Sequence, residues 1–328
     1  MNASGKFSAM DADKVKKILV ITLSNIGDVV LTTAVFNALR KNFPASTVDV
    51  IVGARAAPIF TKDPRIHKVM SYDKSLSLSE KAKFILSLRS ERYDLVVDLR
   101  NTLMPFLLRP RYKTSILSNA KNASAYKKEI HLSRLTRLGI DVRGADFDIW
   151  IDKADEDYAG ELLRAKADGF IVLAPGARSD TKRWGEECFS ELARMLLGGG
   201  ARVVLVGDLS DKKIADGIAA RTSADILNLC AKTTLTQLAA VLKRATLVIS
   251  NDSAVMHVAA AVGTPTIAIF GPTAPLKYGP RGRRDVILRK DLACSPCEKA
   301  QCPQARECLK LITADEVYGA ALRILTNR

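Results

Sequence analysis

Apolar runs of strand length alternate with helical patterns along the chain, and this alternation constrains the fold more than any other feature. The runs are continuous, which is typical of strands covered on both faces. Regular β/α alternation predicts an α/β protein with doubly wound parallel sheets. The predicted strands are Lys17–Leu23, Val48–Val52, His67–Ser71, Leu95–Leu99, Ser115–Leu117, Phe170–Ala174, Ala201–Val206, Ile226–Leu229, Leu247–Ser250, Thr266–Phe270 and Val286–Leu288. The predicted helices are Asp28–Asn42, Glu129–Leu138, Asp155–Ala165, Glu186–Leu197, Asp211–Arg221, Leu235–Arg244, Val258–Val262 and Ala314–Leu325.

The strands and helices fall into two sets of similar length. A chain of 328 residues is also long enough for two domains. A short apolar stretch edged by acids places the boundary near Asp146–Lys153. We therefore expect two Rossmann-like domains, one over residues 1–150 and the other over residues 151–328.

The charge balance points to an acidic partner. The chain has 50 Lys and Arg against 35 Asp and Glu, a net charge of +15, which favours nucleic acid, an anionic membrane surface or a phosphorylated substrate.

No segment approaches the roughly 20 apolar residues of a membrane span. The apolar run Ile18–Leu23 is too short for the core of a signal peptide. We expect a cytoplasmic protein whose cysteines are thiols or metal ligands.

The segment from Asn251 to His257 lies between a predicted strand and a predicted helix. Such a turn sits at the carboxyl end of a parallel strand, where open α/β sheets bind ligands. Backbone N–H groups and the positive end of a helix dipole suit a phosphate. Alternatively, Asp252 only caps the helix and His257 is only structural.

A second turn of interest follows the first strand and contains Gly27 and Asp28. Asp28 would act as a general base at the mouth of a cleft between the domains. Alternatively, it is an acid favoured by the helix dipole in the first turn. No G-x-G-x-x-G and no P-loop motif occurs, which counts against a standard dinucleotide fold and a P-loop NTPase.

A basic turn, Pro175 to Trp184, follows the first strand of the second domain. Lys182 or Arg178 would neutralise a diphosphate leaving group, and Thr181 would donate a hydrogen bond to it. Alternatively, this is a basic surface loop in which Trp184 packs as a helix staple.

Four cysteines near the C-terminus have the pattern C-x2-C-x4-C-x5-C. They are Cys294, Cys297, Cys302 and Cys308. Four thiols within this span would bind a structural zinc ion or an iron–sulfur cluster. Reduced thiols that pack a loop and disulfides are the alternatives.

Taken together, these motifs resemble the lipopolysaccharide heptosyltransferases of glycosyltransferase family 9. The resemblance runs from about Lys17 to the C-terminus. It is carried by Ile26-Gly27-Asp28-Val29, Pro175-Gly176-Ala177, Lys182-Arg183-Trp184, Asp252-Ser253, His257-Val-Ala-Ala-Ala261, Gly263-Thr-Pro265, Phe270-Gly-Pro-Thr273 and the late cysteines. It implies the GT-B architecture, in which two Rossmann-like domains face each other across a cleft.

The resemblance also assigns the domains and the residues. The N-terminal domain would hold a lipid-linked acceptor and the C-terminal domain the nucleotide sugar, and the last helix, near residues 313–326, would pack back on the N-terminal domain. Asp28 matches the catalytic base. The implied donor-binding residues are Arg178, Thr181, Lys182, Thr233 beside the adenine, Asp252 at the sugar, Ser253, Ala254 and His257. Arg100 and Asn101 are expected to contact the acceptor.

One departure from the family pattern concerns Ala254, which stands where the family has glycine. Alanine would be strained at a positive φ and is comfortable in the first turn of a helix. We favour the helical conformation, which keeps the site.

The implied reaction is inverting, metal-independent transfer of heptose from ADP-heptose to a Kdo/heptose–lipid A acceptor of the lipopolysaccharide inner core. No cofactor would be required. The enzyme would be cytoplasmic and peripheral, in contact with the anionic inner face of the bacterial inner membrane. The alternatives are a family member with another nucleotide sugar or acceptor, and a non-enzymatic basic protein that binds nucleotides or nucleic acid. Nucleic acid is disfavoured because aromatic residues make up only 6% of the chain.

Overall fold

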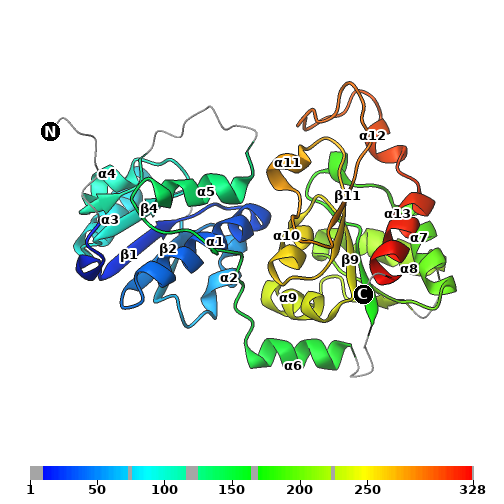
Figure 1. Cartoon of the computed structure of the whole chain (residues 1–328), viewed down its shortest axis with the longest axis horizontal. Coiled ribbons are helices and arrows are strands. Elements are labelled where there is room, and N and C mark those ends of the chain that lie inside the picture. The colour runs from blue at the N-terminus through cyan, green and yellow to red at the C-terminus, as the bar shows by residue number, and fades with distance from the viewer. Residues whose placement is uncertain (1–9, 73–75, 116–124, 164–168, 223–225, 327–328) are drawn as a thin grey trace. The chain divides into compact units, whose positions relative to one another are not determined.

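The computed structural model describes residues 10–72, 76–115, 125–163, 169–222 and 226–326. The chain divides into two compact units, Met1–Trp150 and Ile151–Arg328 (Figure 1). In the described ranges, no helix combines the length and the apolar character that are needed to cross a membrane.

The first unit is built on a parallel sheet with the strand order β3-β2-β1-β4-β5. Its strands are β1 (Lys17–Ile21), β2 (Thr47–Val52), β3 (Lys68–Ser71), β4 (Leu95–Asp98) and β5 (Tyr112–Lys113). The central strand β1 is buried from Ile18 to Ile21, as its continuous apolar sequence predicts. The chain fills one side of β1 with β2 and β3 before it crosses to β4. The order therefore reverses between β1 and β4.

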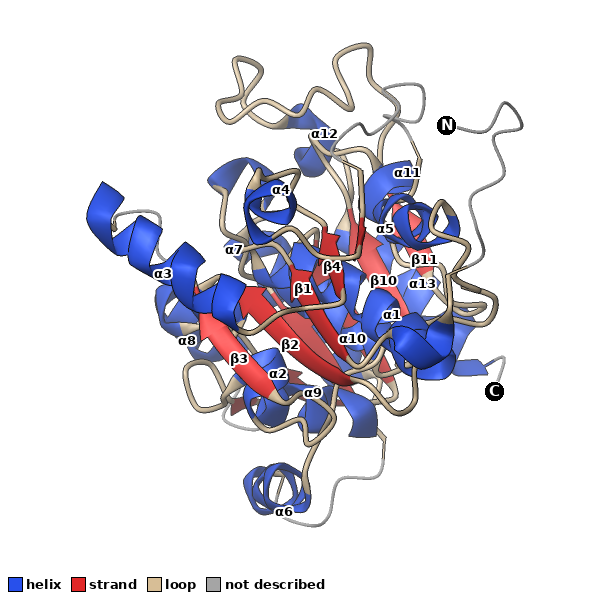
Figure 2. Cartoon of the chain, turned by 90° about the vertical axis from the view of Figure 1, so that its left-hand side faces the viewer, coloured by secondary structure: helices blue, strands red, loops and turns tan. Residues whose placement is uncertain are grey.

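Helices cover both faces of this sheet. They are α1 (Ile26–Asn42), α2 (Pro58–Thr61), α3 (Leu78–Ser90), α4 (Met104–Leu108) and α5 (Lys127–Thr136), with the short 3-10 helices η1 (Ala12–Lys14) and η2 (Ala54–Ala56). Figure 2 shows α3 and α4 on one side of the strands and α1 and α5 on the other. Leu88 of α3 packs with Met104 and Leu108 of α4 against β1 and β4.

The second unit has a six-stranded parallel sheet with the order β11-β10-β9-β6-β7-β8. Its strands are β6 (Phe170–Ala174), β7 (Arg202–Leu205), β8 (Leu227–Asn228), β9 (Leu247–Asn251), β10 (Thr266–Ile269) and β11 (Val286–Leu288). The chain runs from β6 through β7 to β8 and then returns to β9 on the other side of β6. The reversal between β6 and β9 is the place where doubly wound sheets bind ligands.

Helices also cover both faces of the second sheet. They are α6 (Lys153–Leu162), α7 (Glu186–Gly198), α8 (Lys212–Thr222), α9 (Leu235–Arg244), α10 (Ala254–Ala261), α11 (Pro275–Tyr278), α12 (Glu307–Lys310) and α13 (Ala314–Thr326), with η4 (Asp180–Lys182) and η5 (Leu209–Asp211). The α7, α8 and α13 helices lie on one face, and α9 and α10 on the other (Figure 1). The two doubly wound parallel sheets confirm the predicted fold class.

The last helix, α13, contributes its buried side to the second unit. Val317, Ala320, Ala321 and Ile324 lie in the same apolar core as β6, β9 and α7. The resemblance implied that this helix packs on the N-terminal domain. In the structure its buried residues belong to the core of the second unit, and packing on the N-terminal domain stays a prediction.

Several elements differ in detail from the predictions. The edge strand of the first sheet is Tyr112–Lys113, whereas the predicted Ser115–Leu117 lies largely outside the described residues. The helix predicted from Asp155 begins at Lys153, because Asp152 caps it by accepting a hydrogen bond from the N–H of Asp155; its predicted end, 164–165, is not among the described residues. The α3 helix was not predicted. It begins with a capping box of Ser77 and Glu80.

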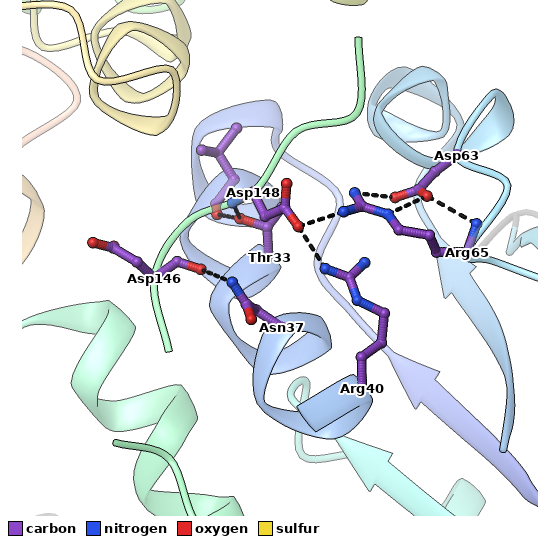
Figure 3. A network of polar contacts seen from close by, with 8 residues as sticks. Thr33, Asn37, Arg40, Asp63, Arg65, Asp146 and Asp148 are labelled. Atoms are coloured by element: carbon purple, nitrogen blue, oxygen red, sulfur yellow. Dashed lines mark hydrogen bonds and ion pairs between the residues drawn. The ribbon is translucent and has the colours of Figure 1, made fainter. Parts of the chain in front are cut away.

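A polar network fixes the last segment of the first unit to α1 (Figure 3). The Asp148 carboxylate accepts hydrogen bonds from Arg40 at 2.5 Å and Arg65 at 2.6 Å. Its backbone N–H donates to Thr33 Oγ1 at 3.1 Å. The Arg65 side chain also binds Asp63 through two hydrogen bonds, at 2.6 and 2.7 Å. Partial burial acts to raise the pKa of Asp148, but the two arginines outweigh it and hold this pKa below its usual value.

We predict that Asp148→Asn lowers the free energy of unfolding by about 1–3 kcal/mol at neutral pH, because it leaves two arginines without their shared anion. Urea denaturation followed by circular dichroism measures this difference. A lowered pKa stabilises the fold above the unfolded-state value of about 3.9, and that contribution is lost as the pH falls below it. The difference between the variant and the wild type should therefore shrink in acid.

The matched control for this prediction is Asp146→Asn, on the same segment. The Asp146 side chain is 72% exposed and pairs only with Lys128 among the ion pairs of the described residues. It should change stability by less than about 1 kcal/mol. Equal losses in the two variants would contradict the role given to Asp148.

Candidate functional site

The polar turns of the second unit gather where its sheet reverses direction. The strands β6, β9 and β10 are adjacent and parallel, so the segments that follow them emerge at the same edge. These segments are the basic turn after Ala174, the turn from Asp252 to Ala254, and the turn after Phe270. The three predicted motifs therefore meet at one edge of one sheet.

Asp252 connects all three turns. Its side chain is 6% exposed. The carboxylate accepts a hydrogen bond from Lys182 Nζ at 2.7 Å and a short one from Thr273 Oγ1. The carboxylate therefore does not serve as a helix cap, because Ser253 is the N-cap residue of α10. A nearly buried anion needs such partners, since burial removes its hydration.

Asn251 is a residue of this site that sequence reasoning missed. It is fully buried, and its Nδ2 donates to the carbonyl oxygen of Pro175 at 2.7 Å. Its Oδ1 accepts from the backbone N–H of Trp184 at 3.1 Å. The two bonds hold both ends of the basic turn against β9. The only signal in the sequence was an amide side chain at the end of an apolar run.

Trp184 anchors the end of the basic turn. Its ring packs edge-on against Phe189, with centroids 5.0 Å apart, and its Nε1 donates to the carbonyl oxygen of Ile312 at 2.8 Å. Because Trp184 precedes the N-cap Gly185 of α7 and Phe189 is the fourth helical residue, this contact is a hydrophobic staple. The staple interpretation of Trp184 is confirmed, while the ligand-binding roles of the basic turn stay predictions.

The cations of the basic turn have different surroundings. Arg183 stabilises the turn itself, since it donates to the carbonyl oxygen of Ala177 at 3.0 Å and pairs with Asp180 at 2.6 Å. Lys182 is directed to Asp252. Arg178 is exposed. Thr181 is half-buried, and its hydroxyl lies 2.7 Å from that of Ser179.

The α10 helix begins at Ala254, and the Ser253 side chain forms no cap hydrogen bond. Ser253 Oγ instead lies 3.1 Å from Ser250 Oγ. Ala254 is the first helical residue and is not among the residues with positive φ. The preference for a helical Ala254 is confirmed, so this position does not need glycine. His257 is buried one turn further along α10.

Thr233 lies apart from this cluster. It is half-buried in the loop between β8 and α9, directly before the N-cap Thr234. Since β6 and β7 lie between β8 and β9, the strand before Thr233 is three positions away from the strand before Asp252. Its predicted place beside the adenine is a prediction that the structure does not test.

In the first unit, the turns after β1 and β4 flank the corresponding reversal of the sheet. Asp28 is the third residue of α1, is half-buried, and accepts a hydrogen bond from Asn25 Nδ2 at 3.0 Å. The turn after β4 is organised by the buried Asp98, which accepts from the backbone N–H groups of Arg100 and Thr102 at 2.7 and 2.5 Å.

Arg134 of α5 is hydrogen-bonded to the same turn. Its Nη1 donates to the carbonyl oxygen of Asp98 at 2.6 Å and to Asn101 Oδ1 at 2.8 Å. Asn101 has a left-handed backbone with φ of 61°, which an Asn tolerates better than most residues.

Burial, with Arg134 and Lys127 nearby, lowers the pKa of His131 to about 3, so this imidazole is neutral. Arg134 and His131 were not predicted.

The predicted metal site at the four late cysteines is not formed. In the described part of the chain, no three His, Cys, Asp or Glu side chains are placed to hold a metal ion, and the cysteines are free thiols. Cys308 is buried in the core of the second unit, whereas Cys294 is exposed. Burial, and then the neighbouring thiols, raise the pKa of Cys308.

Comparisons with known proteins agree with this architecture. The model of glycosyltransferase family 9 (heptosyltransferase) matches residues 81–307, more than half of the chain. The lipooligosaccharide heptosyltransferase 2 of Haemophilus ducreyi is 27% identical over 308 residues, which cover 83% of this chain and 88% of that protein.

Two solved structures share the fold. The ADP-heptose LPS heptosyltransferase II of E. coli has a TM-score of 0.78 and 23% identity, and the match covers 95% of this chain and 99% of that one. A glycosyltransferase of family 9 from Veillonella parvula DSM 2008 has a TM-score of 0.84 and 22% identity, with coverages of 95% and 98%. The two Rossmann-like units therefore have the GT-B fold that the resemblance implied.

Proposed function

The chain belongs to glycosyltransferase family 9, and we propose that it transfers a heptose from ADP-heptose to the inner core of a lipopolysaccharide. Membership of the family makes it a glycosyltransferase and removes the alternative of a non-enzymatic nucleotide- or nucleic-acid-binding protein. The donor and the acceptor follow the names of its relatives. The observation that carries the proposal is the Lys182–Asp252 pair at the reversal of the second sheet.

The second unit would bind the donor. Lys182 stands within reach of a diphosphate, because its Nζ is held at the carboxyl ends of β6 and β9 by Asp252. Arg178, Thr181 and the N–H groups at Ser253 and Ala254 would bind the same phosphates. Asp252 would accept a hydrogen bond from the heptose, His257 would donate one to the diphosphate, and Thr233 would contact the adenine.

The first unit would bind the acceptor and supply the base. Asp28 would take the proton from the attacking acceptor hydroxyl while the bond from the anomeric carbon to ADP breaks. Attack from the face opposite to ADP inverts the configuration. Arg100 and Asn101 follow the same sheet reversal in this unit and would contact acidic groups of the acceptor.

The new charge on ADP would be offset by protein cations. Lys182, Arg178 and the start of α10 supply positive charge where the leaving group would form. We infer that the transfer needs no metal ion. The net charge of +15 would hold the enzyme at the anionic inner face of the inner membrane, where the lipid-linked acceptor is presented.

We predict that Asp28→Asn reduces turnover of ADP-heptose by at least ~10²-fold, since a positioned base contributes about 10²–10⁴-fold. The dissociation constant for ADP should stay within about twofold. Steady-state kinetics and calorimetry measure the two effects. Glu80→Gln is the matched control, because Glu80 is also the third residue of a helix in the first unit. Turnover like that of the wild type in Asp28→Asn would remove Asp28 from the mechanism.

We predict that Lys182→Gln weakens ADP binding about 10- to 100-fold, which corresponds to the loss of one charged hydrogen bond. Calorimetry with ADP, UDP and GDP gives the measurement. Lys212→Gln controls for net charge, because Lys212 is exposed on α8 and pairs with Asp216. If UDP or GDP binds more tightly than ADP to the wild type, the donor is another nucleotide sugar.

We predict that turnover persists in excess EDTA, at a rate within about twofold of the untreated enzyme. The physical reason is that Lys182, Arg178 and the α10 N-terminus replace a metal as the partner of the leaving diphosphate. The assay compares EDTA-treated enzyme with the same enzyme after Mg²⁺ is restored. A loss of activity that Mg²⁺ reverses would overturn the metal-independent mechanism.

A further inference from the structure

The exposed large apolar side chains of the first unit are confined to two neighbouring helices. Among the described residues of this unit they are Leu78, Leu86, Leu103, Phe106 and Leu107. Leu78 is 86% exposed, Leu103 69% and Leu86 63%. Leu78 and Leu86 belong to α3, while the other three lie in α4 or directly before it. Exposed apolar groups on two helices that pack against each other favour a surface that binds a partner.

These side chains are not required by the core beneath them. The helices α3 and α4 pack against each other and supply Leu88, Met104 and Leu108 to the core. Phe84 and Ile85 are partly buried and pack against the same core. The exposed side chains of Leu86 and Phe106 therefore lie outside the buried face of their helices.

Positive charge surrounds these apolar residues. Between residues 76 and 115 the sequence has eight Lys and Arg against four Asp and Glu. Lys83, Arg89, Arg109 and Arg111 are exposed, and Lys113 Nζ lies 4.3 Å from the centre of the Phe106 ring.

Three of the four acids of this region are engaged within the fold. Glu91 pairs with Lys17 and Lys68, Asp94 accepts from the backbone N–H groups of Lys16 and Lys17, and Asp98 is buried in its own turn. Glu80 is exposed in the capping box of α3. The exposed cations outnumber this one exposed acid, so the net outward charge of the surface is positive.

We propose that the outer face of α3 and α4, with the segment to Lys113, lies on an anionic phospholipid bilayer. We call this surface the α3–α4 patch; it consists of Leu78, Leu86, Leu103, Phe106 and Leu107 with Lys83, Arg89, Arg109, Arg111 and Lys113. Leucine and phenylalanine enter the region below the headgroups, while lysine and arginine stay among the lipid phosphates. A second copy of the chain is a poor partner, because two basic surfaces repel each other.

The patch also adjoins the proposed acceptor turn. Asn101 is separated from Leu103 by one residue and Arg100 by two, and Asp98 and Arg134 fix the backbone of that turn. A unit resting on the bilayer through α4 would hold Arg100 at the level of the lipid headgroups. The inference rests in this respect on the proposed function, which gives the enzyme an acceptor anchored in a bilayer.

Flotation of the full chain with vesicles tests the patch. One set contains phosphatidylethanolamine with phosphatidylglycerol, and the other contains phosphatidylcholine alone. Leu86→Ser/Phe106→Ser/Leu107→Ser and Lys83→Gln/Arg109→Gln/Arg111→Gln should each weaken binding to the anionic vesicles at least about tenfold. The wild type should bind the neutral vesicles weakly.

Matched triple variants of the second unit serve as controls. Leu209→Ser/Leu276→Ser/Leu322→Ser and Lys213→Gln/Lys310→Gln/Arg323→Gln alter residues that are also exposed and should bind within about twofold of the wild type. Phe106→Trp should show a blue-shifted emission on anionic vesicles, and Leu209→Trp should not. Equal losses in patch and control variants would overturn the proposal, as would a patch that mediates dimerisation in sedimentation experiments while vesicles stay unbound.

Two further measurements separate this inference from the proposed function. Unchanged thermal unfolding shows that the patch variants fold, and unchanged ADP binding by calorimetry shows that the donor site is intact. If the wild type binds vesicles through the patch and does not bind ADP, the proposed function fails and the patch stands. If the wild type binds ADP and the patch variants bind vesicles as the wild type does, only the proposed role of the patch is wrong.

Discussion

The nearly buried carboxylate of Asp252 is the group on which the polar edge of the second unit depends. Such an anion requires close cations or donors, because its hydration is lost. The chain supplies Lys182 from the turn after β6 and Thr273 from the turn after β10. Asn251, one residue earlier, holds the backbone of the β6 turn. One strand end thus joins three turns that are far apart in sequence.

The first unit has a buried acid in a comparable place, but its partners differ in a way that matters for ligands. Asp98 is satisfied by N–H groups of its own loop, so it shapes the turn and has little capacity for a substrate. Asp252 is satisfied by side chains, and that of Lys182 remains 30% exposed. A diphosphate would attract the Lys182 side chain without any change in the backbone. We infer that Asp252, rather than Asp98, is the acid whose partners change on binding.

The strands were predictable because continuous apolar runs such as Phe170–Ala174 and Val286–Leu288, bounded by turns, are typical of strands in a parallel sheet. The contacts between turns that are far apart in the sequence were not predictable. Lys182 and Asp252 are separated by 70 positions, and only the order of β6, β9 and β10 brings them together. The roles of Asn251 and Arg134 were missed for the same reason, since each supports a turn from another element. The cysteine spacing misled because it carries no information on burial, and Cys308 is directed into the core.

The failure to predict α3 has a physical cause that bears on function. Periodicity finds a helix when its apolar residues share one face, and α3 places Leu88 in the core while Leu78 and Leu86 face outward. The helix is instead specified by its capping box at Ser77 and Glu80. A sequence that breaks the pattern of a water-exposed helix is under some requirement other than folding. The bilayer contact that we propose for the α3–α4 patch would supply that requirement for both helices, because leucine on the outside of a helix is favourable in lipid.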